Sequence, residues 1–116
     1  MTVDDAEAGV TEVVRGCDLL SSAPRQMYLQ SLLGFSQPEY GHIPMLLSSD
    51  GRRLSKRDRD LDMGVLRNRM TAQALIGKLS FAAGLTDTES PISPSELATV
   101  FQWERLKKDD IFLKEL

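Results

Sequence analysis

Short apolar runs alternate with turn residues in the first half of the chain, and they predict a strand, a helix and a second strand. Residues 13–16 are Val-Val-Arg-Gly, which is typical of a short buried strand with a tight exit. Residues 21–34 predict a helix, because a serine cap, a proline in the first turn and a final glycine frame an apolar pattern. The apolar positions at helical spacing are Leu29, Leu32 and Leu33. Residues 42–47 predict the second strand, although Pro44 removes a ladder hydrogen bond and favours an edge or an irregular end.

The second half of the chain has a helical pattern. A turn over residues 48–52 comes first, and Asp62 can then cap a short helix that continues through Arg69. Thr71 can cap a longer helix whose apolar stripe ends at Gly84. Residues 86–92 predict a loop, because they are rich in Thr, Asp, Ser and Pro.

The last predicted helix has the clearest start. Ser93-Pro94-Ser95-Glu96 is a capping box with proline at the first helical position. We expect Phe101 and Trp103 to anchor this helix in the core.

Composition places the chain among globular proteins. It has 116 residues, enough for one small domain or for a piece of a larger one, and 41% of them are hydrophobic. No apolar run approaches the roughly 20 residues that span a bilayer, so we expect a cytoplasmic protein with no membrane partner. The single Cys17 excludes an internal disulfide and cannot bind zinc by itself.

Charge is unevenly distributed although the net value is only −3. Residues 1–12 carry acids and no cation, whereas residues 52–69 are rich in Arg and Lys. This local basic stretch could serve a triphosphate, a tRNA acceptor end or merely solvated helix faces, and composition does not choose among them.

The basic stretch begins with Arg53-Leu54-Ser55-Lys56-Arg57, set in a glycine turn directly after the apolar run of residues 42–47. This basic loop, residues 53–57, resembles the mobile signature loop with which class I aminoacyl-tRNA synthetases hold ATP phosphates during amino-acid activation. Such a loop works by positioning and electrostatics as pyrophosphate leaves. On its own, such a basic pentapeptide is more often a solvated turn.

A longer ordered series of motifs supports the same family. From Asp4 through Arg57 the chain presents an acidic pair, Val-Val-Arg-Gly, Ser-x-Pro-Arg-Gln, His-x-Pro, Asp-Gly and Leu-Ser-Lys-Arg in that order. This series resembles the second half of the glutamyl-tRNA synthetase catalytic core. The chain stops shortly after residues 101–106, and in this it resembles the glutamyl-Q-tRNA(Asp) synthetases, which lack the helical anticodon-binding region.

The resemblance implies a mixed α/β fold that is mainly α. Residues 1–57 are expected to form the C-terminal half of a Rossmann-like class I synthetase core, including the basic loop. Residues 58–116 are expected to form a small helical stem-contact subdomain.

The resemblance also implies roles for residues at the nucleotide. Lys56 corresponds to the catalytic lysine that contacts ATP, and Ser55 and Arg57 correspond to loop-positioning and secondary phosphate contacts. Arg53 stands where a lysine is more usual, and it keeps the charge but presents a planar fork. His42 is expected near the nucleotide, although a lone histidine beside a proline also has a structural interpretation.

Arg15 is the expected contact to the glutamate substrate, because it corresponds to a substrate-binding arginine of the family. It stands at the end of a predicted strand, where ligands gather in open α/β sheets. A guanidinium can hold a carboxylate through two parallel hydrogen bonds. The alternative is a structural salt bridge from Arg15 to Asp18 or Asp5.

These inferences predict part of a glutamyl-Q-tRNA(Asp) synthetase-like ligase, which would use L-glutamate, ATP, Mg²⁺ and tRNA. We expect no metal ligands in this chain, and any zinc site would lie outside it. Because the N-terminal half of the core is missing, we expect the isolated chain to be inactive and its exposed truncated core to favour a non-native dimer or partial disorder in residues 1–20. The alternatives are a part of a glutamyl-tRNA synthetase that charges tRNA(Glu), and a non-catalytic paralogue that binds RNA or protein.

Overall fold

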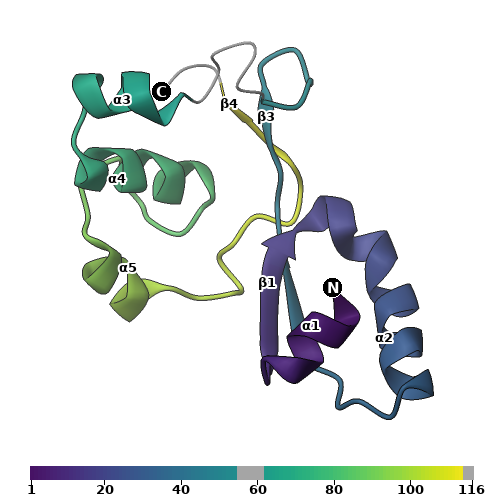
Figure 1. Ribbon diagram of the computed structural model, residues 1–116. Coiled ribbons are helices and arrows are strands. Elements are labelled where there is room, and N and C mark those ends of the chain that lie inside the picture. Colours follow the sequence, from purple (N-terminus) through teal and green to yellow (C-terminus); the bar gives the residue numbers. More distant parts are fainter. Residues whose placement is uncertain (55–61, 114–116) are drawn as a thin grey trace. The chain divides into compact units, whose positions relative to one another are not determined.

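The computed structural model describes residues 1–54 and 62–113, which fall into two compact units, Met1–Ile43 and Pro44–Leu116 (Figure 1). The units thus divide between Ile43 and Pro44. The predicted functional boundary at residue 57 is a different division, and it stays a prediction. No helix among the described residues is long and apolar enough to cross a bilayer.

The first unit is built on a parallel strand pair joined by a helical crossover. Its elements are α1 (Thr2–Glu7), β1 (Glu12–Gly16), the 3₁₀ helix η1 (Cys17–Ser22), α2 (Ala23–Leu32) and β2 (Glu39–Ile43). β1 and β2 pair in parallel, so that Arg15 lies opposite His42. Parallel strands cannot be joined by a tight turn, and η1 with α2 supplies the longer connection that they need (Figure 1).

The helix predicted over residues 21–34 is present, but its start and its inner face differ from the expectation. Ser22 makes no side-chain cap, because η1 precedes it and its backbone is already helical, with φ −84° and ψ −20°. The buried residues of α2 are Ala23 and Gln30. The three leucines at helical spacing are exposed instead: Leu29 (47%), Leu32 (64%) and Leu33 (52%).

The predicted strand over residues 13–16 is confirmed as part of β1, but its burial is not. Val13 is half-buried, whereas Val14 is 59% exposed. Successive side chains of a strand point to opposite faces, so one face of β1 is left open.

The described part of the second unit contains three helices and a second parallel strand pair. Its elements are β3 (Leu46–Ser48), α3 (Met63–Arg69), α4 (Ala72–Ala82), α5 (Pro94–Val100) and β4 (Ile111–Leu113). β3 pairs in parallel with β4 (Figure 1). In this pairing Leu46 lies opposite Ile111. The sequence pattern predicted neither β4 nor α1.

The single strand predicted over residues 42–47 is wrong, because two strands of different units share that segment. β2 ends at Ile43 and β3 begins at Leu46. Pro44 lies between them and has no N–H to continue a ladder. The Met45 carbonyl accepts from the Ile111 N–H at 2.8 Å, which directs the chain into the second strand pair.

The predicted helix starts of the second unit are confirmed. The Asp62 carboxylate accepts from the Gly64 N–H at 2.8 Å, and the Thr71 hydroxyl accepts from the Ala74 N–H at 3.1 Å. Ser93 and Glu96 form both bonds of the capping box, each 3.2 Å long. These bonds satisfy N–H groups that have no partner inside a helix.

The apolar core of the described residues is small. Its buried members are Ala23 in the first unit and Leu66, Leu85 and Ile111 in the second. Phe101 and Trp103 were expected in the core, and that expectation is wrong. They pack edge to face with ring centroids 5.2 Å apart, and they are 37% and 49% exposed.

Candidate functional site

Arg15 and His42 lie side by side near the carboxyl ends of β1 and β2. Each is the fourth residue of its five-residue strand, and the parallel register places them directly opposite each other. The Nε of Arg15 donates to the Nε2 of His42 at 3.2 Å. Ligands of open α/β sheets bind at this edge of the strands, so the location suits a binding residue.

The crossover supplies two more partners to the same guanidinium. One terminal nitrogen of Arg15, Nη1, donates to the Oε1 of Gln26 on α2 at 2.6 Å. The other, Nη2, donates to the carbonyl of Leu19 in η1 at 3.3 Å. The guanidinium carbon also lies 4.9 Å from the ring centroid of Tyr40, within the range of a cation–π contact.

Tyr40 is itself held on both sides. Its ring is stacked on His42 with centroids 6.2 Å apart and an interplanar angle of 15°. Its hydroxyl accepts from the Nε2 of Gln30 at 2.8 Å. The Oε1 of Gln30 is buried and has no hydrogen-bond partner among the described residues. The Nε2 of Gln30 thus orients Tyr40. The unpaired Oε1 of the same amide costs about 1–3 kcal/mol, because a buried acceptor without a partner loses its hydration.

The electrostatic character of this cluster follows from its partners. The groups that hold Arg15 are an imidazole, an amide, a carbonyl and an aromatic ring, and none of them carries a negative charge. Within the described chain, the three bonds use three of the five N–H groups of a guanidinium and leave two, one on each terminal nitrogen. A half-buried, oriented cation with two remaining donors is suited to bind a carboxylate.

Sequence reasoning named Arg15 and His42 as candidate site residues, and that assignment stays a prediction. It did not name Gln26, Gln30 and Tyr40, which belong to the same network of contacts. The two glutamines are four residues apart on α2, so they lie on one face of that helix. The sequence signal that could have revealed them is the spacing of two glutamines on the helix face that also carries the buried Ala23.

The described stem of the basic loop is a tight turn, as predicted for residues 48–52. The Ser48 N–H donates to the Arg52 carbonyl at 2.9 Å, and the Gly51 N–H donates to the Ser48 carbonyl at 3.0 Å. Gly51 has φ +86°, a conformation that favours glycine. An antiparallel bridge between Leu47 and Arg53 closes the turn.

The basic loop contributes four residues that are expected to contact phosphate, and one of them, Arg53, is among the described residues. Arg53 is exposed at the end of the turn. Ser55, Lys56 and Arg57 lie outside the described residues.

A hydroxyl and a cation surround the carboxylate of Asp50 in the turn. The Ser48 hydroxyl donates to Asp50 Oδ1, and the Nε of Arg52 lies 3.8 Å from Asp50 Oδ2. These contacts lower the pKa of Asp50, the hydrogen bond from Ser48 most of all, with smaller effects from backbone N–H groups and the charge of Arg52. Asp50 therefore remains ionised and supports the turn.

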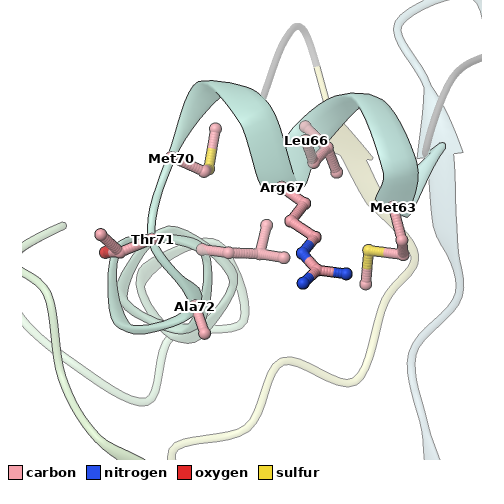
Figure 2. A pocket seen from close by; sticks show the side chains of 7 residues that line it. Met63, Leu66, Arg67, Met70, Thr71 and Ala72 are labelled. Carbon is pink, nitrogen blue, oxygen red and sulfur yellow. The ribbon is translucent and has the colours of Figure 1, made fainter.

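A pocket of about 250 Å³ lies between α3 and α4 (Figure 2). Its lining is mainly apolar and consists of Met63, Leu66, Arg67, Met70, Thr71, Ala72 and Leu75. In Figure 2 the side chains of Arg67 and Met63 extend from α3 toward the space beside α4. The lining contains one cation, Arg67, and one hydroxyl, that of Thr71, which caps α4.

The described residues contain no group of three or more His, Cys, Asp or Glu side chains placed to hold a metal ion. Of the cations predicted from the sequence to bind a ligand, the described residues include Arg15 and Arg53.

Comparison with known proteins relates the chain to aminoacyl-tRNA synthetases. Residues 1–112 match the family described as tRNA synthetases class I (E and Q), catalytic domain. A glutamyl-Q tRNA(Asp) synthetase of Symbiobacterium thermophilum is 41% identical over 112 residues, which are 96% of this chain and 35% of that protein. A protein of the same name from Geobacter sulfurreducens is 48% identical over 98 residues, 84% of this chain and 30% of that protein. The chain thus spans about a third of the length of these relatives.

Solved structures show the same fold. A crystal structure of a glutamate tRNA ligase from Elizabethkingia meningosepticum in complex with its amino acid matches with a TM-score of 0.73 at 24% identity, over 96% of this chain and 26% of that one. The glutamate-tRNA synthetase of Elizabethkingia anophelis matches with a TM-score of 0.74 at 22% identity, over 97% of this chain and 27% of that one. These matches confirm the expected mixed α/β, mainly α fold of a Rossmann-like synthetase core.

Proposed function

Because the chain belongs to the class I tRNA synthetase (E and Q) catalytic-domain family, we propose that it is part of a glutamyl-Q-tRNA(Asp) synthetase-like ligase that activates glutamate with ATP and transfers it to tRNA. The names of the curated relatives support this assignment. One observation in the structure carries it: Arg15 is held by neutral groups at the carboxyl edge of a parallel strand pair, with two N–H groups left.

We assign Arg15 to the carboxylate of the glutamate substrate. A cation already paired with an acid would have to break that pair before it bound substrate, whereas the neutral partners of Arg15 leave its charge available. Two parallel N–H bonds would fix the carboxylate and the direction of the amino acid. The role of Arg15 in this assignment is binding and orientation.

We assign the basic loop to the phosphates of ATP. Lys56 would stabilise the charge that develops as pyrophosphate leaves, and Arg53, Ser55 and Arg57 would make the accompanying contacts. The tight turn of residues 48–52 supports this role, because it fixes the end of β3 from which the loop departs. Magnesium would accompany the nucleotide and neutralise part of the phosphate charge.

A chimeric enzyme tests the function. Residues 1–112 of this chain would replace the matching segment of the Symbiobacterium thermophilum relative, and glutamate-dependent ATP–pyrophosphate exchange would be measured without tRNA. We expect exchange with glutamate, and we expect Arg15→Lys to raise the KM for glutamate at least tenfold, since lysine cannot form a two-pronged bond. Arg25→Lys, the same exchange on α2, is the matched control and should leave that KM unchanged. A folded chimera without glutamate-dependent exchange would refute the assignment.

The tRNA and the size of the native protein distinguish the alternatives. Exchange that requires tRNA, together with charging of tRNA(Glu), would favour a glutamyl-tRNA synthetase. A native species of only 116 residues, detected by immunoblot of the source organism, would favour a non-catalytic paralogue. Salt-dependent tRNA binding by that species, weakened by Lys56→Ala and Arg57→Ala, would then identify it as an RNA-binding protein.

A further inference from the structure

We propose that His42 is a positioning residue for Arg15: a neutral imidazole with its proton on Nδ1 accepts the Nε–H of Arg15 and orients the guanidinium for the substrate carboxylate. The inference deepens the function proposed above and rests on the assignment of Arg15 to glutamate. It gives His42 a role different from the nucleotide contact expected from the sequence.

The identity of the donor determines the protonation of the acceptor. The Nε of arginine carries a proton and can only donate, so the His42 Nε2 that it contacts at 3.2 Å must be unprotonated. A neutral imidazole holds its one proton on the other nitrogen, here Nδ1. A doubly protonated ring could not accept this bond and would place a second positive charge beside the guanidinium.

This bond determines which part of Arg15 can meet a ligand. Because Nε is engaged by His42, a carboxylate cannot use the edge formed by Nε and one terminal nitrogen. Gln26 and the Leu19 carbonyl each take one N–H from a different terminal nitrogen, which fixes the plane of the group. The two N–H groups that remain, one on each terminal nitrogen, are the number that a carboxylate accepts.

The fold keeps His42 in place for this role. The register of β1 and β2 pairs its backbone position with that of Arg15. Stacking on Tyr40 holds the ring, and Gln30 holds Tyr40 in turn. Because the register and the stacking already orient the His42 ring, it loses little further conformational freedom when it accepts the bond from Arg15. A positioning residue needs this pre-orientation.

Nitrogen NMR on the whole 116-residue chain tests the contact directly, because the chain contains one histidine and the signal is unambiguous. With ¹⁵N-labelled histidine, we expect a protonated Nδ1 and an unprotonated Nε2. Arg15→Leu removes the donor and should change this tautomer, whereas the control Arg25→Leu should not. A proton on Nε2, or a tautomer that does not respond to Arg15→Leu, would overturn the proposal.

Kinetics of the chimera give a second test that does not depend on the stability of the isolated chain. His42→Leu should raise the KM for glutamate roughly tenfold to a hundredfold, the usual range for a lost hydrogen bond to a charged group, with the KM for ATP nearly unchanged. His42→Gln can place an acceptor oxygen near the position of Nε2 and should restore part of the affinity. A rise in the KM for ATP alone, or equal effects of the two substitutions, would refute a positioning role.

The two experiments separate failure of the inference from failure of the proposed function. The expected tautomer, combined with a glutamate KM that Arg15→Lys leaves unchanged, would preserve the Arg15–His42 contact and reject the glutamate assignment. A proton on Nε2, combined with a glutamate KM that Arg15→Lys raises, would preserve the assignment of Arg15 to glutamate and reject the role of His42.

Discussion

Arg15 and His42 are 27 residues apart in the chain, yet the Nε of one lies 3.2 Å from the Nε2 of the other. The parallel register of β1 and β2 produces this contact, and α2 adds Gln26 from the crossover that joins the strands. The strand–helix–strand unit therefore builds the cationic site by itself.

On the proposed assignment of Arg15 to glutamate, Gln26→Leu is predicted to weaken glutamate binding without removing any charge. The substitution deletes the 2.6 Å bond to Nη1 of Arg15 and leaves the His42 contact in place. In the chimera we expect the KM for glutamate to rise about tenfold, the value for one hydrogen bond to a charged group. Gln37→Leu is the control, because Gln37 is exposed and, among the described residues, its side chain donates to the Met27 carbonyl. Equal effects of the two substitutions would show that Gln26 does not orient Arg15.

Ser93→Ala is predicted to destabilise α5 by about 1 kcal/mol, the usual cost of losing a helix cap. It removes the acceptor of the Glu96 N–H, a bond of 3.2 Å. Hydrogen exchange of the amides at Glu96 and Leu97 should accelerate about fivefold. Ser95→Ala, one position inside the helix, is the matched control. Unchanged protection of α5 in Ser93→Ala would contradict the prediction.

Helix starts could be predicted from the sequence because the groups that form them are local. Thr71 and Ser93 each contact an N–H three residues ahead, so the motif and the bond occupy the same short segment. The turn after β3 is equally local. Gly51 takes φ +86° because the chain must reverse between Ser48 and Arg52.

The pairing of distant segments could not be predicted in this way. Ile111 pairs with Leu46 across 65 positions, and nothing in the segment around Ile111 indicates that partner. Leu29, Leu32 and Leu33 have helical spacing, but this spacing does not show which face of α2 packs on the strands. The pattern therefore did not reveal that Gln26 and Gln30 face inward. Arg15 was named from the family resemblance, but its partners came from the strand register and the crossover.

Gly77→Ala is predicted to destabilise the second unit although alanine favours helices. A Cβ at this position in α4 would lie 2.8 Å from the carbonyl carbon of Ser90 and even closer to its oxygen. Those atoms belong to backbone that the Ile92 N–H ties to the Gln73 carbonyl at 3.1 Å, so they cannot simply move aside. Overpacking costs about 1–3 kcal/mol, which should exceed the gain of at most about 1 kcal/mol from helix propensity.

Urea unfolding monitored by circular dichroism measures this effect. Lys78→Ala, the neighbouring position in α4, is the control and should change stability little. A stabilised Gly77→Ala would show that the loop over residues 86–92 does not pack on α4.

Ser48→Ala is predicted to raise the pKa of Asp50 toward its ordinary value. The hydrogen bond from Ser48 is the main cause of the lowered pKa, and alanine cannot donate. Because the folded pKa lies below the unfolded one, the turn gains stability above the unfolded pKa and loses it as the pH falls through the folded pKa. A carbon NMR titration of the Asp50 carboxyl checks the shift. An unchanged titration midpoint in Ser48→Ala would assign the effect to the backbone and Arg52 instead.

Self-association of the isolated chain is the last prediction, and it follows from apolar side chains that the first unit leaves uncovered. Leu32 on α2 is 64% exposed, Leu33 is 52% exposed and Val14 on β1 is 59% exposed. Exposed apolar groups on a two-stranded sheet and its helix favour contact with another copy. Sedimentation velocity should show a mass that rises with protein concentration.

Leu32→Lys combined with Leu33→Lys should shift the chain toward the monomer, because two charges on one face oppose its burial. The cluster around Arg15 should be unaffected, since its α2 partner Gln26 is on the inward face of the helix. Val65→Lys is the control, at an apolar position of α3 that is 45% exposed. Equal effects of the double substitution and of Val65→Lys on the monomer fraction would show that association does not use α2. An unmodified chain that stays monomeric at every concentration would show that the exposed leucines do not drive association.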